Sequence, residues 1–206
     1  MDATLAALAV VVATILGVTA LIPQIVKLVR TGDPAGISAT WPAIGLVSNA
    51  AWSAYLIQAG LWPASISTSS MIGFYALVLW ALRRAGAPLR RPVVRGIVWG
   101  AVLAMITAGA GWFVLGTVLG FSQFIQMAPA IWTAYRTAIP SGISAVTWWI
   151  SGIEGTLWGY YGWYHGDIPV MIFAATFFTT AVLMLARYHA VVRSPAYPPE
   201  MTRSAS

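Results

Sequence analysis

The fold is decided by residues 23–66, PQIVKLVRTGDPAGISATWPAIGLVSNAAWSAYLIQAGLWPASI, because the chain contains this stretch twice. Shifted by 106 residues, it lies without a gap over residues 129–172, PAIWTAYRTAIPSGISAVTWWISGIEGTLWGYYGWYHGDIPVMI. Fifteen residues coincide, and they include three prolines, an Arg-Thr pair and the aromatic positions Trp52 and Tyr55. Self-similarity at a fixed spacing is the signature of a structural unit used more than once. The sequence therefore predicts two copies of one module.

The composition is that of an integral membrane protein. Of the 206 residues, 59% are hydrophobic and only 8% are charged, and the mean hydropathy is +0.79. A helix needs about 20 apolar residues to cross a hydrocarbon core of about 30 Å. Seven segments meet this requirement, so the predicted fold is all-α with seven transmembrane helices, at residues 5–26, 38–58, 61–82, 93–112, 113–135, 144–164 and 169–188.

The basic residues predict the orientation. With the N-terminus outside, the loops after the first, third and fifth spans and the C-terminal tail are cytoplasmic. Positive residues are enriched on that side of membrane proteins, so we expect the N-terminus outside and the C-terminus in the cytoplasm, in the plasma (inner) membrane. The basic charge is then a topological signal beside lipid headgroups and not a nucleic-acid surface. All eleven Lys and Arg residues fit this orientation: Lys27, Arg30, Arg83, Arg84, Arg90, Arg91, Arg95, Arg136, Arg187, Arg193 and Arg203.

The repeat also predicts the role of the fourth span. A module of three crossings ends on the side opposite to its start, so a second copy with the same orientation requires one additional crossing. The fourth span supplies it, and Gly96, Gly100, Ala104 and Ala108 give it a small face suited to close packing. We expect a 3+1+3 arrangement: a triple-helix bundle at 1–86, an inversion linker helix at 87–112, a second bundle at 113–190 and a disordered cytoplasmic tail at 191–206.

Prolines mark candidate hinges. Pro23 stands near the cytoplasmic end of the first span, where proline removes a backbone donor and Gln24 can bond the freed carbonyl. Pro42 and Pro129 extend this set. The alternative interpretation is a static kink filled by neighbouring side chains. Ser38, which precedes the second span, is the expected N-cap of that helix.

A set of short motifs stands along the two copies: Pro23-Gln24, Arg30-Thr31, Gly36-Ile37-Ser38, Trp52 with Tyr55, and Pro63 in the first, and the LWGYYG run at 157–162 followed by Asp167-Ile168-Pro169 in the second. Together these motifs resemble the PQ-loop superfamily, and specifically the SWEET and SemiSWEET sugar transporters. The resemblance implies triple-helix bundles duplicated through an inversion helix, with parallel repeats of the kind named for SWEETs. The resemblance covers both modules, and it depends on the motifs in combination, because a single dipeptide is weak evidence for a family.

The resemblance also implies a substrate site between the modules near the middle of the membrane. Tryptophans on the second helix of each bundle would frame it, and these match Trp52 and Trp158; the alternative is plain bundle packing. The chain departs from the family where an asparagine is usual after the conserved proline. Hydroxyl side chains stand in that region instead, and they are candidate substrate ligands: Ser69, Ser70 and Thr176. Trp148 and Trp149 replace the fourth bundle proline, and alanine replaces the second glutamine.

Glu154 is the one acidic residue inside a predicted span. A charge at the centre of a membrane helix costs about 2.5 kcal/mol or more, so we expect the carboxyl to face a cavity and to favour its protonated form. Helical spacing places Glu154 on one face with Trp158, and Asn49 on one face with Trp52. Glu154 and Asn49 are therefore candidate substrate ligands. The alternative for Glu154 is a protonated side chain that bonds a neighbouring helix.

Three functions remain open at this stage. The first is a transporter that moves a small sugar down its gradient by alternating access. The second is a proton-coupled carrier of an amino acid or other small polar metabolite that uses Glu154. The third is a receptor, because KDEL receptors resemble the same fold. We expect no catalysis, no cofactor and no metal, since the chain has no cysteine and His165 and Asp167 stand without a nucleophile. A homo-oligomer is compatible with all three functions.

Overall fold

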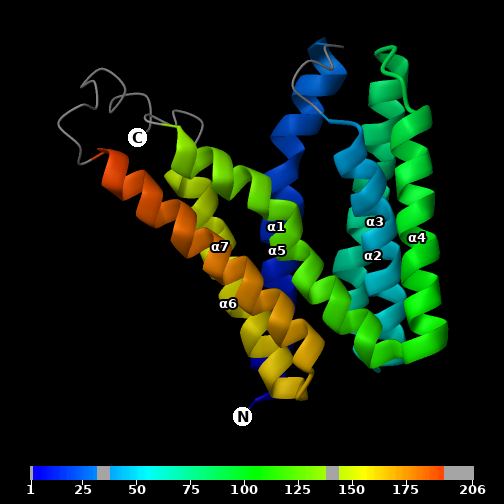
Figure 1. Ribbon diagram of the computed structural model, residues 1–206. Helices are drawn as coiled ribbons and strands as arrows, with labels where there is room; N and C mark the ends of the chain where they lie inside the picture. Colours follow the sequence, from blue (N-terminus) through cyan, green and yellow to red (C-terminus); the bar gives the residue numbers. More distant parts are fainter. Residues whose placement is uncertain (1, 32–37, 138–143, 193–206) are drawn as a thin grey trace. The chain divides into compact units, whose positions relative to one another are not determined.

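The computed structural model describes residues 2–31, 38–137 and 144–192, and in these ranges the chain is built of helices (Figure 1). The predicted all-α fold is confirmed, and each predicted span coincides with one helix to within five residues at either end. The helices are α1 (Ala3–Thr31), α2 (Thr40–Gln58), α3 (Trp62–Arg84), α4 (Arg90–Ala110), α5 (Trp112–Arg136), α6 (Ala145–His165) and α7 (Ile168–Val192).

Four of these helices are long and apolar enough to cross a membrane. They are Trp62–Arg84, Arg90–Ala110, Trp112–Arg136 and Ile168–Val191, and a shorter apolar stretch covers Ala3–Thr19. The protein is therefore a multi-pass integral membrane protein. The count of seven crossings and the 3+1+3 arrangement stay predictions.

The internal repeat is visible in the helix boundaries. When α2 is shifted by 106 residues, both of its ends fall within one residue of the ends of α6. The same shift brings the start of α3 onto the start of α7, and α1 onto α5 to within three residues. Among the helices described, α4 has no counterpart, as expected of an inserted helix.

The chain divides into two compact units, which we describe separately. One unit is Thr14–Leu119, and the other combines Met1–Ala13 with Gly120–Ser206. In the first unit α2 packs against both α3 and α4, and in the second α6 packs against α7 (Figure 1). The modules predicted at 1–86 and 113–190 stay predictions, and most of the predicted tail, residues 193–206, lies outside the described residues.

Glycines of α4 let it approach α2 closely. A Cβ at Gly96 would lie 3.1 Å from the carbonyl oxygen of Ala43, and one at Gly100 would lie 3.2 Å from a Val47 methyl group. Between these contacts, the indole Nε1 of Trp99 donates a hydrogen bond of 2.9 Å to Oγ of Ser48. The small face predicted for this span is thus correct in its first half. In its second half Ala104 and Ala108 are exposed, and close packing there stays a prediction.

The helix ends show which predicted caps were correct. The expected cap of α2 by Ser38 is wrong: Ala39 occupies the N-cap position in helical geometry and α2 begins at Thr40. Its counterpart Ser144 does cap α6, since its hydroxyl accepts from the backbone N–H of Thr147 at 3.3 Å. Near the N-terminus, a hydrogen bond from the backbone N–H of Thr4 to the Asp2 carboxylate lowers the pKa of that exposed group.

Three glycines end helices in the same way. Gly60, Gly86 and Gly166 have positive φ values of 76°, 80° and 67°, which a side chain with a Cβ rarely tolerates. After each glycine, the next residue donates its N–H to a carbonyl five residues back, at 2.7, 3.0 and 2.8 Å respectively. This pattern is the Schellman motif, which reverses the chain tightly. Gly60 and Gly166 are equivalent in the repeat, so both modules use the same turn.

Candidate functional site

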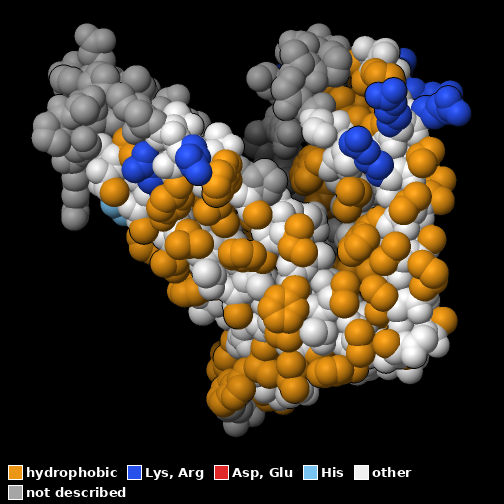
Figure 2. Space-filling view, viewed as in Figure 1, with side chains coloured by type: hydrophobic (Ala, Val, Ile, Leu, Met, Phe, Trp, Pro, Cys, Tyr) orange, Lys and Arg blue, Asp and Glu red, His pale blue; other side chains and the backbone are white. Residues whose placement is uncertain are grey.

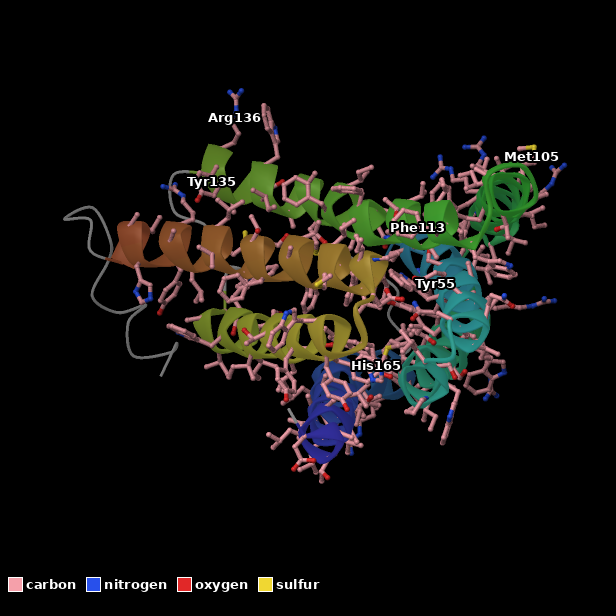
Figure 3. All side chains as sticks on the ribbon, turned by 90° about the horizontal axis from the view of Figure 1, so that it is seen from below. Tyr55, Met105, Phe113, Tyr135, Arg136 and His165 are labelled. Carbon is pink, nitrogen blue, oxygen red and sulfur yellow. The ribbon has the colours of Figure 1, made fainter. Side chains whose placement is uncertain are left out.

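Each copy of the module buries a tryptophan edge-on against a tyrosine of the same helix. The rings of Trp52 and Tyr55 on α2 lie 5.7 Å apart at 76°, and those of Trp158 and Tyr161 on α6 lie 6.1 Å apart at 87°. Figure 3 labels Tyr55 on its helix. In the second copy Phe173 of α7 adds an edge contact to Trp158 at 6.1 Å. The two copies thus pair the repeated tryptophan with a tyrosine of the same helix in a similar edge-on geometry.

Both tryptophans are buried. Only 8% of Trp52 and 6% of Trp158 is exposed. A sugar that stacks on an indole needs most of a ring face, because its C–H groups pack on the aromatic surface. The predicted stacking role therefore requires neighbouring side chains to move away during transport, and it stays a prediction.

Glu154 is partly buried on α6, and its carboxyl interacts with the side chain of Trp158 one turn later. The predicted common face of these two residues is therefore confirmed. The indole N–H is the only donor of a tryptophan side chain, so it is the group directed toward the carboxyl. Glu154 and Trp158 form the one acid–aromatic pair among the residues singled out from the sequence.

The repeat shows what differs around Glu154. Its equivalent in the first copy is Ser48, which is 5% exposed and accepts the hydrogen bond from Trp99 of α4. The second copy has no described helix equivalent to α4. Glu154 therefore stands on the face of α6 that corresponds to the α4-covered face of α2. Ile153 belongs to the same face, at the position equivalent to Val47, and is 52% exposed.

Asn49 is turned toward its own helix. Its side-chain nitrogen donates a hydrogen bond of 2.9 Å to the carbonyl of Gly45, four residues earlier. The side chain is partly buried. An amide held in this way still offers its carbonyl oxygen as an acceptor. Asn49 can therefore accept a hydrogen bond from a ligand hydroxyl and keep its bond to Gly45.

The three predicted hydroxyl ligands have different settings. Ser69 is exposed and lies 3.3 Å from the hydroxyl of Ser53 on α2. Ser70 is exposed and donates to the carbonyl of Ile66 at 2.8 Å. Thr176 is partly buried and lies within hydrogen-bonding distance of two carbonyls, 3.2 Å from Gly120 and 2.8 Å from Phe173. A hydroxyl that donates to its own helix keeps lone pairs for a ligand.

The structure joins the predicted residues in two separate groups. In the unit 14–119, Trp52 and Asn49 lie on α2, and Ser69 of α3 reaches the same helix through Ser53. In the other unit, Trp158 and Thr176 both contact Phe173. The convergence of the two groups on one substrate stays a prediction.

A polar contact that we did not predict lies between α2 and α3. The hydroxyls of Ser53 and Thr68 are 2.6 Å apart, and Ser53 is 7% exposed. The only sequence signal is the run of hydroxyl residues from Ser65 to Ser70, which marks α3 as polar but does not identify the partner. At the equivalent positions of the second copy stand Gly159 and Ala174, where a Cβ on the glycine would lie 3.5 Å from the alanine methyl group.

The predicted hinge residues lie inside or at the start of helices. α1 continues for eight residues beyond Pro23, and α5 continues for seven beyond Pro129, so neither proline ends its helix. The side chains of Pro23, Gln24 and Pro129 lie outside the part of the structure that is described. Pro42 is fully buried in the first turn of α2, where a missing N–H breaks no helical hydrogen bond. The hinge role stays a prediction.

Comparison with known protein families finds a match over the first copy of the module. Residues 5–65 match the family described as PQ loop repeat. This range contains the first proline motif, the repeated Trp52 and Tyr55, and the turn at Gly60. No curated protein matches the chain in sequence. Within the described ranges, no group of three or more His, Asp or Glu residues could hold a metal ion.

Proposed function

Because residues 5–65 match the PQ loop repeat family, we propose that the protein is a membrane transporter that moves a small sugar down its gradient by alternating access between two bundles. The N-terminus lies outside and the C-terminus in the cytoplasm, in agreement with the distribution of Lys and Arg residues. The substrate binds between the bundles, where Trp52 and Trp158 flank it and Asn49, Ser69, Ser70 and Thr176 supply hydrogen bonds. The prolines near the ends of the first and fifth helices allow the bundles to move.

The repeated aromatic pair carries this proposal. Trp52 with Tyr55 and Trp158 with Tyr161 have the same geometry in the two copies, although the residues that pack beside them differ. An indole presents an apolar face to sugar C–H groups and an N–H donor to a hydroxyl. Two such groups on equivalent helices suit a ligand with apolar faces and a rim of hydroxyls.

Uptake into proteoliposomes tests the proposal. Purified protein is reconstituted, and uptake and counterflow are measured for a panel of labelled mono- and disaccharides and amino acids. Trp52→Phe and Trp158→Phe keep an aromatic ring and remove the N–H donor, and we expect about a fivefold loss of kcat/KM for the sugar, as for one hydrogen bond of about 1 kcal/mol. Trp62→Phe and Trp163→Phe are the controls, because these rings are 64% and 59% exposed. Equal effects in all four variants would contradict the proposed role.

Glu154 favours a second candidate function, a proton-coupled carrier of an amino acid or another small polar metabolite. The carboxyl lies on the α6 face that has no equivalent of α4 over it, and it pairs with Trp158. A carboxyl at this depth can take up and release a proton, which an amide of the same shape cannot do. In this mechanism the proton on Glu154 and the substrate cross the membrane together.

The variant Glu154→Gln separates the two functions. A proton-coupled carrier loses its response to an imposed pH gradient in this variant, whereas counterflow of the substrate continues. A facilitative sugar transporter shows no response to the gradient in either form. Wild-type and variant uptake are compared at several external pH values, with expression and thermal stability measured in parallel. A gradient response that persists in Glu154→Gln would rule out this residue as the coupling group.

A receptor resembling the KDEL receptors is the third candidate. Gripping a charged peptide requires a cavity with several charges, and Glu154 is the one acid within the predicted spans. Binding of peptides without uptake of any small solute would favour this function over transport.

A further inference from the structure

A groove at one end of the unit 14–119 is separate from the residues of the candidate functional site. Its volume is about 1070 Å³, and it lies between the start of α2, the turn that joins α3 to α4, and the first turns of α4. Three arginines of α4 line it, Arg90, Arg91 and Arg95. Figure 2 shows Lys and Arg side chains gathered at the end of this unit, above a surface of hydrophobic side chains.

The walls of the groove are fixed by hydrogen bonds. The turn after α3 is the Schellman motif at Gly86, in which the N–H of Ala87 donates to the carbonyl of Leu82 at 3.0 Å. Arg95 spans from α4 to α2, because its Nη1 donates to Oγ1 of Thr40 at 3.1 Å. A guanidinium has five N–H donors, so this bond holds Arg95 in place and leaves donors for a ligand.

The arginines have no acidic partner among the described residues of their unit. Residues 14–31 and 38–119 contain no Asp or Glu. All three side chains are exposed. At the start of α4, the N–H groups of Arg90 and Arg91 have no carbonyl one turn earlier in the helix to bond. The groove therefore presents positive charge and N–H donors together, which is the combination that recognises phosphate groups.

The position of the groove indicates a lipid as the source of the phosphate. α3 and α4 each have the length and composition of a membrane span, so the turn that joins them lies at the membrane surface, at the level of the headgroups. Apolar side chains of α4 continue from the groove toward the membrane interior. Val94, Ile97 and Val98 are 52%, 65% and 58% exposed, and they offer a surface on which acyl chains can pack.

We propose that this groove binds the phosphate of an anionic phospholipid headgroup, with Arg91 and Arg95 as its main ligands and the exposed apolar face of α4 against its acyl chains. A phosphate pairs with a guanidinium through two parallel hydrogen bonds. The site does not depend on the identity of the transported substrate, and it ties the surface end of α4 to the lipid.

The test measures lipid binding to the purified full-length protein in neutral detergent. Bound phosphatidylglycerol is counted by native mass spectrometry over a range of lipid concentrations, with phosphatidylcholine as the zwitterionic comparison. At about 1 kcal/mol for each basic residue near a charged lipid surface, the double variant Arg91→Gln, Arg95→Gln is expected to bind phosphatidylglycerol about thirtyfold more weakly. The matched control is Arg83→Gln, Arg84→Gln, which removes the same charge at the end of α3 from residues that do not line the groove.

Further conditions decide the source of the phosphate and the specificity of the site. Sodium phosphate that competes with phosphatidylglycerol at equal concentration would support the phosphate site and assign it to a soluble ligand. Equal losses in the two double variants, or phosphatidylcholine bound as tightly as phosphatidylglycerol, would overturn the proposal. Asp33 lies outside the described residues, so the variant Asp33→Asn tests whether its carboxylate pairs with the arginines of the groove. Binding in this variant that is at least about tenfold tighter would show that the chain's own carboxylate occupies the arginines, and would also overturn it.

Discussion

The packing of α6 against α7 gives the sharpest test of the structure. Glycines along one face of α6 meet α7 at unequal distances. A Cβ at Gly155 would lie 3.0 Å from the backbone nitrogen of Phe178 and 3.2 Å from its Cα. A Cβ at Gly159 would lie 3.5 Å from the methyl group of Ala174, which is an ordinary contact distance. The same substitution to alanine should therefore have opposite effects at these two positions.

The expected magnitudes follow from two terms. Alanine is favoured over glycine within a helix by about 0.8–1 kcal/mol. At Gly155 the added methyl group meets backbone atoms that no side-chain rotation can move, and such overpacking costs about 1–3 kcal/mol. We expect Gly155→Ala to lower the free energy of unfolding by up to about 2 kcal/mol, and Gly159→Ala to raise it by up to about 1 kcal/mol.

Unfolding in detergent measures this difference. The purified variants are titrated with sodium dodecyl sulfate in dodecyl maltoside micelles, and the fluorescence of the tryptophans reports unfolding. Gly73→Ala on α3 is the control for helix propensity, because no atom lies within 4 Å of the added Cβ apart from its own helix backbone and chain neighbours. If Gly155→Ala were as stable as Gly159→Ala, the close approach of α6 to Phe178 would not be part of the folded state.

Three other substitutions test single contacts with the same unfolding assay or with amide exchange. Thr68→Val removes the 2.6 Å contact with Ser53, and we expect a loss of about 0.6–1 kcal/mol, as for hydrogen bonds between membrane helices; an unchanged midpoint would contradict this. Trp99→Phe removes the 2.9 Å bond from α4 to α2 and should cost about 0.5–1.5 kcal/mol, unless α4 is held by its glycine contacts alone. Arg187→Gln loses bonds of 2.9 and 2.7 Å to two carbonyls at the end of α5, so amide exchange there should accelerate while exchange in α2 stays the same.

Two arginines at the end of the second unit show what the sequence can predict and what it cannot. The sequence assigns Arg136 and Arg187 to the cytoplasmic side but cannot distinguish their roles. In the structure Arg136 extends away from the end of α5 (Figure 3) and its guanidinium lies 4.4 Å from the ring centre of Trp132. Arg187 instead holds the carbonyls of Ala134 and Thr137. Their charge predicts the side of the membrane, whereas the contact depends on the packing of α7 against α5.

The helices and the repeat were predictable because both depend on local or periodic features. Apolar runs fix the spans, and glycines such as Gly60 and Gly166 fix the turns. The bond from Trp99 to Ser48 could not be predicted in the same way, because it depends on the rotation of α4 about its axis when it packs on α2. The prediction that Ser38 caps α2 was wrong although the two copies have a serine at equivalent positions. Ser144 caps α6, whereas Ser38 stands one residue before the N-cap of α2.

The candidate site was predictable only in part. Helical spacing alone places Glu154 beside Trp158, and the structure confirms this pairing. The hydroxyl contact of Ser53 with Thr68 was missed, since a run of serines and threonines does not show which of them faces the neighbouring helix. Ser53 follows Trp52 directly, so the first copy has a polar contact beside its tryptophan that the sequence did not indicate.

The two copies keep the aromatic pair while the contacts around it differ. Beside Trp52, α2 and α3 are joined by hydroxyls at Ser53 and Thr68. Beside Trp158, the equivalent positions are Gly159 and Ala174, which bring α6 and α7 together by close packing. A tryptophan that served only to fill space would be expected to change with its neighbours, because core side chains adapt to the volume around them. Its retention in two unlike settings supports the proposed substrate contact of both indoles, and under that proposal the unequal residues beside them determine selectivity.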